Sequence, residues 1–244
     1  MSPPSRTVIL HCHLFKNAGT SLDHILKQNF GDRWVTREFD MGQGSNTDQV
    51  EDWILTSPKA VAFSSHTVTG PLPVISDTEI VPILLLREPL SRISSAYRFE
   101  RNQQADTFGA KLAKESDLAG YVSSRLANPQ DRQCQNFQSW RLAMFCPGPE
   151  TELQRAKAGA ALINDVGVLG LVEAFDQALM ALQRRVEDVF PDFAWQQVRA
   201  NTTTKSSESR LDQSLRQQLE NANADDLSLL RHAQKLLCAD QLSD

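Results

Sequence analysis

The chain has 244 residues, of which 41% are hydrophobic, and its formal net charge at pH 7 is -5. That length supports one domain with a substantial core. The negative charge excludes a protein built as a whole to bind nucleic acid or an anionic membrane surface, so an anionic ligand needs a local cluster of basic side chains.

The cysteines and the N-terminal residues indicate in which kind of compartment the protein works. None of the four cysteines has the C-x-x-C spacing of a zinc site, and their scatter indicates a reducing compartment without a disulfide framework. The N-terminus lacks the apolar segment of a secretion signal, and no apolar run approaches the ~18 residues of a membrane span. We therefore expect residues 1–6 to be a disordered tail and residues 7–244 to form one domain without a membrane span.

Strand-like and helix-like patterns alternate along the chain. In chain order, we expect a strand at 7–14, helices at 19–29 and 48–55, strands at 61–63 and 80–86, and helices at 89–101, 118–127, 134–145 and 151–163. A strand at 166–172 and helices at 174–190, 211–220 and 225–239 follow. The polar stretches 31–47, 67–77, 104–115 and 201–209 are expected at the surface. Strands separated by helices predict an α/β fold, a central parallel sheet flanked by helices.

The first motif lies in residues 8–22, which read VILHCHLFKNAGTSL. An apolar strand leads into a small-residue turn at Lys16, and helical spacing begins near Leu22. A strand, a turn and a helix in this order bring several backbone N–H groups and a helix N-terminus to one point, which favours phosphate binding. Lys16 precedes Gly19, whereas the loop of nucleotide triphosphatases has its lysine after the last glycine.

This order resembles the 5'-phosphosulfate loop of sulfotransferases that use 3'-phosphoadenosine 5'-phosphosulfate (PAPS). The branch it resembles contains the heparan and chondroitin O-sulfotransferases and their bacterial relatives, whose loop reads H-I-P-K-T-[GA]-G-T-S-[LF]. The matching residues are His13, Lys16, Ala18, Gly19, Thr20, Ser21 and Leu22. Phe15 replaces Pro, and Asn17 replaces Thr. The resemblance implies that the 5'-phosphosulfate is bound by Lys16, Asn17, Ala18, Gly19, Thr20 and Ser21.

The second motif, residues 84–97, follows the most apolar predicted strand and reads LLLREPLSRISSAY. Arg87 stands at the end of that strand, where open α/β sheets bind ligands, and a guanidinium binds phosphate through paired hydrogen bonds. The stretch resembles the family's 3'-phosphate motif, L-R-D-P-[VL]-x-R-[FL]-x-S-x-[YF], with Glu88 in place of Asp. The resemblance implies that Arg87 and Ser95 bind the 3'-phosphate of the cofactor.

Weaker similarities extend the resemblance over residues 7–239 and imply the P-loop-like sulfotransferase fold. Residues 135–143, 169–176 and 226–233 resemble the family's segment near the acceptor, its strand-to-helix join and its closing helix. Lys205 lies where the family has a variable loop over the cofactor. Lys205 is therefore a candidate third phosphate contact, and the alternative is an ordinary solvated lysine.

Sulfuryl transfer needs a base for the acceptor hydroxyl and a cation near the leaving oxygen. Lys16 suits the second role, because an ammonium at the strand end stabilises charge that develops on that oxygen. His66 is the candidate base, since histidine titrates near neutrality and His66 ends a predicted strand. Residues 66–70 also approximate the H-x-x-[YF]-G segment that carries a catalytic histidine in the family. The alternative for His66 is an ordinary, hydrogen-bonded histidine.

The other histidines and Glu173 have simpler interpretations. His11 and His13 share one strand face, because side chains alternate along a strand. With His66 they form a histidine group, but no nearby carboxylate or cysteine pattern accompanies it, so we expect no metal site. His13 is interpreted as a brace for the loop, as its family counterpart would be. Glu173 is interpreted as a structural partner of an arginine.

The sequence therefore predicts a PAPS-dependent O-sulfotransferase that transfers to a hydroxyl, carried by a carbohydrate or another small metabolite. The eukaryotic glycan sulfotransferases of the resembled family are anchored in the Golgi by an apolar segment that is missing here, so we expect a cytoplasmic protein. No nucleic-acid partner is expected, and a homo-oligomer is compatible with the sequence. Two alternatives stay open: a nucleotide kinase on a related fold, and an inactive relative that binds a nucleotide or a partner.

Overall fold

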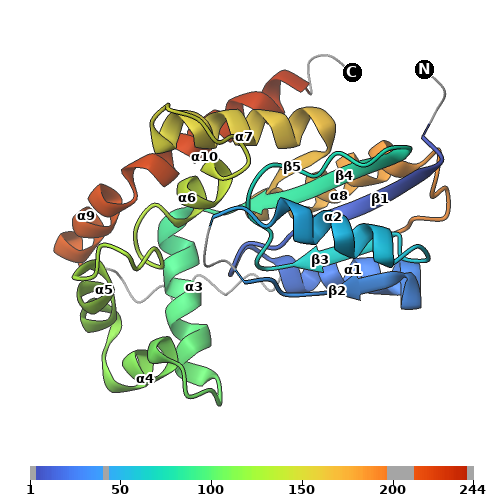
Figure 1. The fold of residues 1–244 in the computed structure, drawn as a ribbon. Coiled ribbons are helices and arrows are strands. Elements are labelled where there is room, and N and C mark those ends of the chain that lie inside the picture. Colours follow the sequence, from blue (N-terminus) through green and yellow to red (C-terminus); the bar gives the residue numbers. More distant parts are fainter. Residues whose placement is uncertain (1–3, 41–43, 197–211, 241–244) are drawn as a thin grey trace.

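The computed structural model describes residues 4–40, 44–196 and 212–240. The strands of these ranges are β1 (Arg6–Cys12), β2 (Trp34–Thr36), β3 (Ala62–Ser65), β4 (Thr78–Leu86) and β5 (Val168–Leu171). They form a five-stranded sheet in the order β2-β3-β1-β4-β5, and every neighbouring pair is parallel (Figure 1). This confirms the expected α/β fold with a central parallel sheet flanked by helices.

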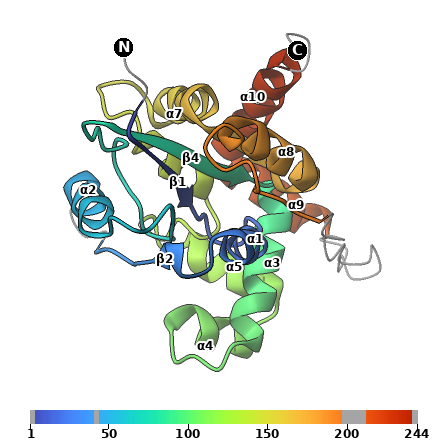
Figure 2. The ribbon, with the colours of Figure 1, turned by 90° about the vertical axis from the view of Figure 1, so that its right-hand side faces the viewer.

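The helices cover both faces of the sheet, and several extend beyond its end (Figures 1 and 2). In chain order they are α1 (Gly19–Phe30), α2 (Thr47–Thr56), α3 (Pro89–Asn102), α4 (Phe108–Glu115), α5 (Leu118–Leu126), α6 (Phe137–Ala143), α7 (Glu152–Val166), α8 (Phe175–Val186), α9 (Gln213–Ala222) and α10 (Ala224–Asp240). Two short 3-10 turns, η1 (Gly31–Arg33) and η2 (Val172–Ala174), complete the described elements. None of these helices is both long enough and apolar enough to cross a membrane.

The core follows from the alternation of side chains along β1. Val8 and Leu10 pack on one face with Trp53 of α2 and Ile163 of α7, whereas Ile9 packs on the other face with α1 and α8. All three β1 residues are fully buried. Full burial of each such side chain stabilises the fold by about 1.5–3 kcal/mol. Because both faces are covered, the strand reads as a continuous apolar run.

A third apolar cluster lies beyond the carboxyl end of β4. It joins α3, α4, α5 and α9, with Ile93, Tyr121 and Leu219 fully buried at its centre. In Figure 1 these helices form the end of the molecule farthest from the N-terminus. The helices therefore stand beside the carboxyl edge of the sheet, and α3 leads directly away from β4.

Three expectations from the sequence were wrong in detail. Residues 31–47 contain β2, whose three residues are too few to show a strand pattern. Residues 104–115 contain α4, which begins after Thr107, whose side chain caps the N–H of Ala110. Arg6, expected in the tail, is the first residue of β1. Its guanidinium fixes it there, because it donates to the carbonyl groups of Ile54, Ser57 and Ala60, in the last turn of α2 and just after it.

The connections place a topological switch at β1. The chain builds β2 and β3 on one side of β1 and then crosses to build β4 and β5 on the other. In a parallel sheet, such a switch opens a crevice at the carboxyl ends of the strands, where ligands bind. The segments that follow β1, β3 and β4 meet at this edge, and they carry Lys16, His66 and Arg87.

Candidate functional site

The turn after β1 presents free backbone N–H groups. Lys16 and Ala18 have positive φ angles of 64° and 59°, which turn the chain sharply into α1. Ala18 is the N-cap, and it provides no side-chain cap. In the described part of the chain, the N–H groups of Ala18, Gly19 and Thr20 donate to no protein acceptor, whereas the Ser21 N–H donates to the Ala18 carbonyl (3.0 Å). Three free amides at a helix N-terminus form a cradle for an anion.

Asn17 differs from its neighbours, because its N–H donors are already engaged within the protein, although its buried Oδ1 has no hydrogen-bond partner. Its side chain is 1% exposed, and Nδ2 donates to the Leu85 carbonyl (2.7 Å) and to Oε1 of Gln138 (2.8 Å). Its N–H donates to the Leu14 carbonyl (3.1 Å). The structure therefore gives Asn17 a bracing role and not the cofactor contact that the sequence led us to expect. A buried amide fixes the loop to β4 and α6.

Gly19 is required by the ring of His13. A Cβ atom on Gly19 would lie 2.0 Å from both Cδ2 and Nε2 of that ring. Non-bonded heavy atoms do not approach so closely, so a larger residue at position 19 would displace the imidazole or the start of α1. The ring of His13 thus lies directly against the first residue of α1, beside the free amides.

Lys16 and Arg87 meet at the same turn. Nη1 of Arg87 donates to the Lys16 carbonyl (3.0 Å), and Nζ of Lys16 lies 4.4 Å from the centre of the Phe99 ring on α3. Partial burial, and then the positive charges of Arg87 and Arg98, lower the pKa of Lys16 from its ordinary value. A bound anion would relieve this repulsion among cations. The cations are therefore gathered before any ligand is present.

Arg87 is fixed through its backbone, and part of its guanidinium is left without a partner. Oε1 of Gln138 accepts its N–H (2.9 Å) and Nε2 of Gln138 donates to its carbonyl (2.8 Å). Its buried Nε has no hydrogen-bond partner. Ser95 is half-buried on α3, one turn before Phe99, and therefore lies on the helix face that approaches Lys16. This arrangement fits an anion that is bound between the strand end and α3.

Glu88 and Glu173 support the start of α3. The Glu88 carboxylate accepts the N–H groups of Leu90 (3.1 Å) and Ser91 (2.6 Å), so it caps the helix as an aspartate would. Glu173 accepts the Glu88 N–H (3.2 Å), and its charge acts on Arg87. These contacts agree with the structural interpretation of Glu173.

His66 is oriented by a carboxylate that the sequence analysis did not identify. Its Nδ1 lies 2.7 Å from Oε1 of Glu38, which also accepts the His66 N–H, and the imidazole is 48% exposed. Burial alone would raise the pKa of Glu38, but hydrogen bonds from His66 and Thr67 outweigh it and hold that pKa below its ordinary value. Nη2 of Arg141 holds the His66 carbonyl (2.9 Å). With Nδ1 bonded to a carboxylate, Nε2 is left to accept a proton.

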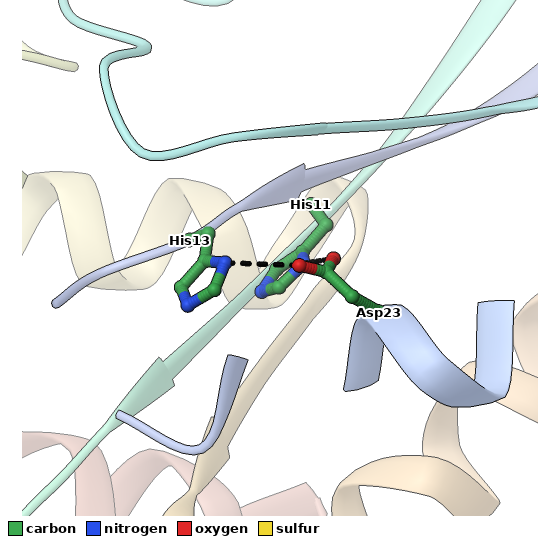
Figure 3. A group of neighbouring side chains, drawn as sticks. All are labelled: His11, His13 and Asp23. Carbon is green, nitrogen blue, oxygen red and sulfur yellow. Dashed lines mark hydrogen bonds and ion pairs between the residues drawn. The ribbon is translucent and has the colours of Figure 1, made fainter. Parts of the chain in front are cut away.

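A stack of imidazoles connects His66 to the interior. The ring centres of His66 and His13 are 3.8 Å apart, and those of His13 and His11 are 4.8 Å apart. Nδ1 of His11 and Nδ1 of His13 lie 2.7 Å and 3.1 Å from the two carboxylate oxygens of Asp23 on α1 (Figure 3). Burial lowers the pKa of His11 to about 4, so His11 is neutral at pH 7. Hydrogen bonds from both histidines and Ser64 overcome the effect of burial and hold the pKa of Asp23 well below its usual range.

Two imidazoles and one carboxylate are also the ligands of many zinc and iron sites. The candidate ligand atoms of His11, His13 and Asp23 lie within 4.8 Å of one another. Asp23 is thus a nearby carboxylate that the sequence pattern did not reveal. The two rings are stacked with an interplanar angle of 14°, and each Nδ1 faces a different oxygen of Asp23. This geometry fits hydrogen bonds to a shared carboxylate better than it fits ligation of one ion.

The family assignment rests on comparison of the whole chain with known proteins. Residues 4–233 match the model of the sulfotransferase family. The chain belongs to the sulfotransferase family. A protein of Archaeoglobus fulgidus is 39% identical over 204 residues, which cover 81% of this chain and 80% of that relative, and it is itself described as an uncharacterized protein. Membership of the family implies sulfotransferase activity, and the five-stranded parallel sheet agrees with the P-loop-like fold of sulfotransferases.

In this sulfotransferase the structure brings most of the expected residues together. Lys16 and Arg87 share a hydrogen bond, and the stack of His66 on His13 reaches the loop at Gly19. Ser95 lies on the same helix face as Phe99, although it makes no side-chain hydrogen bond within the described chain. Lys205 lies outside the described residues.

Residues of the weaker motifs lie behind the candidate site and brace it. Gln138 braces both Asn17 and Arg87, and Arg141 holds the His66 segment. Asp226 of α10 accepts the N–H groups of Gln138 (3.1 Å) and Ser139 (2.7 Å), and so caps α6. The family-like spacing of these motif residues was visible in the sequence, but their burial behind the loop was not.

Proposed function

We propose that this protein is a PAPS-dependent O-sulfotransferase that uses His66 as its general base. The observation that carries the proposal is the meeting of three groups at the carboxyl edge of the sheet. They are the free amides at the start of α1, the Lys16–Arg87 pair, and the His66–Glu38 pair. An anion cradle, two cations and an oriented base are the parts that sulfuryl transfer to a hydroxyl requires.

The N-terminus of α1 and Lys16 would hold the 5'-phosphosulfate. When bound, PAPS supplies a sulfuryl group. The acceptor oxygen bonds to sulfur as the bond between sulfur and the bridging phosphate oxygen breaks, and the electron pair of the broken bond remains on the bridging oxygen. The amides of Ala18, Gly19 and Thr20 donate hydrogen bonds to the anion. The ammonium of Lys16 neutralises the charge that collects on the leaving oxygen.

The His66–Glu38 pair would move the proton of the acceptor hydroxyl. Glu38 accepts the Nδ1–H of His66, which leaves the Nε2 lone pair for the proton of the hydroxyl. The imidazolium that forms is then neutralised by Glu38, 2.7 Å away. The Arg141 hydrogen bond to the His66 backbone keeps the ring at the strand end.

Arg87 and Ser95 would bind the 3'-phosphate, and this contact distinguishes PAPS from ATP. The free Nε of Arg87 and the hydroxyl of Ser95 are donors with no present partner in the described chain. A guanidinium can offer two parallel N–H groups to one phosphate. Lys205 stays a proposed third contact. We propose a carbohydrate or another small hydroxyl compound as acceptor, because the family resemblance favours it.

The first experiment measures the formation of 3'-phosphoadenosine 5'-phosphate from PAPS with a panel of monosaccharides, oligosaccharides and phenols. We expect acceptor-dependent turnover by the wild type and a loss of about 100-fold or more in the His66→Ala variant. The cofactor should bind equally well to both proteins. Turnover that is unchanged in His66→Ala would overturn the assignment of the base. Absence of turnover with every acceptor, combined with normal PAPS binding, would favour an inactive relative.

A further inference from the structure

We propose that His13 is a positioning residue for the transfer step, because its ring is the surface on which the imidazole of His66 rests. This inference rests on the proposed function, in which His66 is the base. The ring centres lie 3.8 Å apart with an interplanar angle of 30°, the closest of the ring pairs in the described chain. His66 is about half exposed, whereas His13 is 5% exposed. An exposed base therefore lies on a buried, immobile ring.

His13 is held from three directions. Its N–H donates to the Ser65 carbonyl (3.0 Å), which continues the pairing of β1 with β3. Its Nδ1 faces Asp23 (3.1 Å), and its Cδ2–Nε2 edge lies against Gly19. Figure 3 shows the remaining ring nitrogen directed away from Asp23. The ring can neither rotate nor retreat without disturbing α1, so its orientation is determined by the fold.

The geometry of the stack places the face of the His13 ring against His66, while Asp23 holds the edge of the His13 ring. Asp23 is ionised and accepts hydrogen bonds from His11 and His13 at once, so one carboxylate serves two imidazoles. The first residue of α1, Gly19, adjoins the opposite edge of the His13 ring. The His13 ring thereby presents its π face to the imidazolium that His66 becomes when it takes the acceptor proton.

Of the other groups near His66, Glu38 stabilises its imidazolium, and Arg141 is engaged with backbone carbonyl groups. Glu38 lies at its Nδ1 and carries the opposite charge. Arg141 binds the backbone carbonyl of His66 and that of Val68. His11 lies one ring farther along the stack and is neutral, because its burial lowers its pKa to about 4. The transition to imidazolium is therefore supported on one side by a carboxylate and on one face by a ring.

Two substitutions separate the ring of His13 from its hydrogen bond. His13→Phe keeps a flat ring and removes the bond to Asp23. His13→Asn keeps a donor at the place of Nδ1 and removes the ring. If the ring supports a cationic His66, His13→Asn lowers kcat by about threefold to thirtyfold, the range expected for loss of a cation–π contact. His13→Phe then stays within about twofold of wild type, and KM for PAPS changes little in either variant.

A brace for the loop alone would give the reverse result. In that case His13→Phe, which lacks the tie to Asp23, raises KM and lowers the unfolding temperature, and His13→Asn is nearly normal. That outcome would overturn the proposal. Thermal unfolding of both variants identifies any loss of kcat that comes from misfolding.

A spectroscopic measurement keeps the proposal testable without activity. A long-range proton–nitrogen NMR spectrum of the wild type should show a proton on Nδ1 of His11 and on Nδ1 of His13. The ring protons of His66 should be shifted upfield by the His13 ring, in wild type and in His13→Phe but not in His13→Asn. Absence of that shift in wild type would refute the stack. A normal shift without turnover of PAPS would leave the stack intact and refute the proposed function instead.

Discussion

The guanidinium of Arg87 and the backbone carbonyl of Lys16 are joined by a hydrogen bond of 3.0 Å. This bond connects the end of β4 to the turn after β1, and thus the two sharpest sequence motifs. Nη1 of Arg87 is used in this bond, whereas its buried Nε has no hydrogen-bond partner. The residue proposed to bind the 3'-phosphate therefore also fixes the loop proposed to bind the 5'-phosphosulfate.

Replacement of Arg87 by lysine should weaken cofactor binding. A lysine keeps the charge but cannot hold the Lys16 carbonyl and offer paired N–H groups at the same time. We expect the binding free energy of 3'-phosphoadenosine 5'-phosphate, measured by calorimetry, to become less favourable by roughly 1–3 kcal/mol. Arg101→Lys on the same helix is the matched control, since Arg101 bonds to Tyr97 and Ser116. An equal loss in both variants would contradict a specific role for Arg87.

Replacement of Gly19 by alanine should destabilise the protein and disturb the imidazole stack. The new Cβ would lie 2.0 Å from the His13 ring, so that ring or the start of α1 has to move. Overpacking of this kind costs about 1–3 kcal/mol in unfolding free energy, which denaturant titration measures. Gly120→Ala on α5 is the control: its nearest neighbour would be 3.1 Å away, so we expect a change within about 1 kcal/mol. Equal stability of the two variants would show that the ring is not fixed against α1.

Replacement of Glu38 by glutamine should lower kcat by about tenfold or more. Glutamine has a similar shape, but it does not neutralise an imidazolium and can select the wrong tautomer of His66. Steady-state kinetics should place the loss in kcat, with KM for PAPS unchanged. The exposed Glu187→Gln at the end of α8 should keep full activity. Full activity of Glu38→Gln would mean that His66 needs no carboxylate partner.

Acid should destabilise this protein through His11. Its pKa is about 4 in the folded chain and near 6.5 when unfolded, so the unfolded state binds more protons between these values. Stability present above pH 6.5 is therefore lost as the pH falls toward 4, by up to about 3 kcal/mol from this group. His11→Asn, which keeps a donor for Asp23, should lose less over the same window in denaturant titrations at several pH values. Identical slopes for both proteins would contradict the assignment of a neutral, buried His11.

The sequence predicted those parts of the site that follow from local pattern. Lys16 lies between a strand and a helix, and His66 and Arg87 end or follow strands, so the topology alone brings them to one edge. Glu38 could not be found in this way, because it follows a three-residue strand in a stretch without periodicity. Only the pairing of β2 with β3 carries it to His66.

Burial explains the remaining differences. Asn17 stands at a loop position where cofactor contacts are expected, yet its amide has partners on β4 and α6, which lie 68 and 121 residues away in sequence. No local pattern records such partners. The clamp made by Gln138 was likewise hidden, since its segment resembled an acceptor site and instead braces the loop from behind.

The most direct test of the account is thermal unfolding with 3'-phosphoadenosine 5'-phosphate, compared with AMP, ADP and ATP, each with and without Mg²⁺. At 100 times its dissociation constant, a ligand of the folded state adds about 2.7 kcal/mol, enough to raise the midpoint by several degrees. The account predicts a shift with the 3'-phosphorylated nucleotide that does not depend on Mg²⁺ and is reduced by Arg87→Lys. A shift only with ATP and Mg²⁺ would contradict it and indicate a kinase, and no shift with any nucleotide would refute the cofactor site.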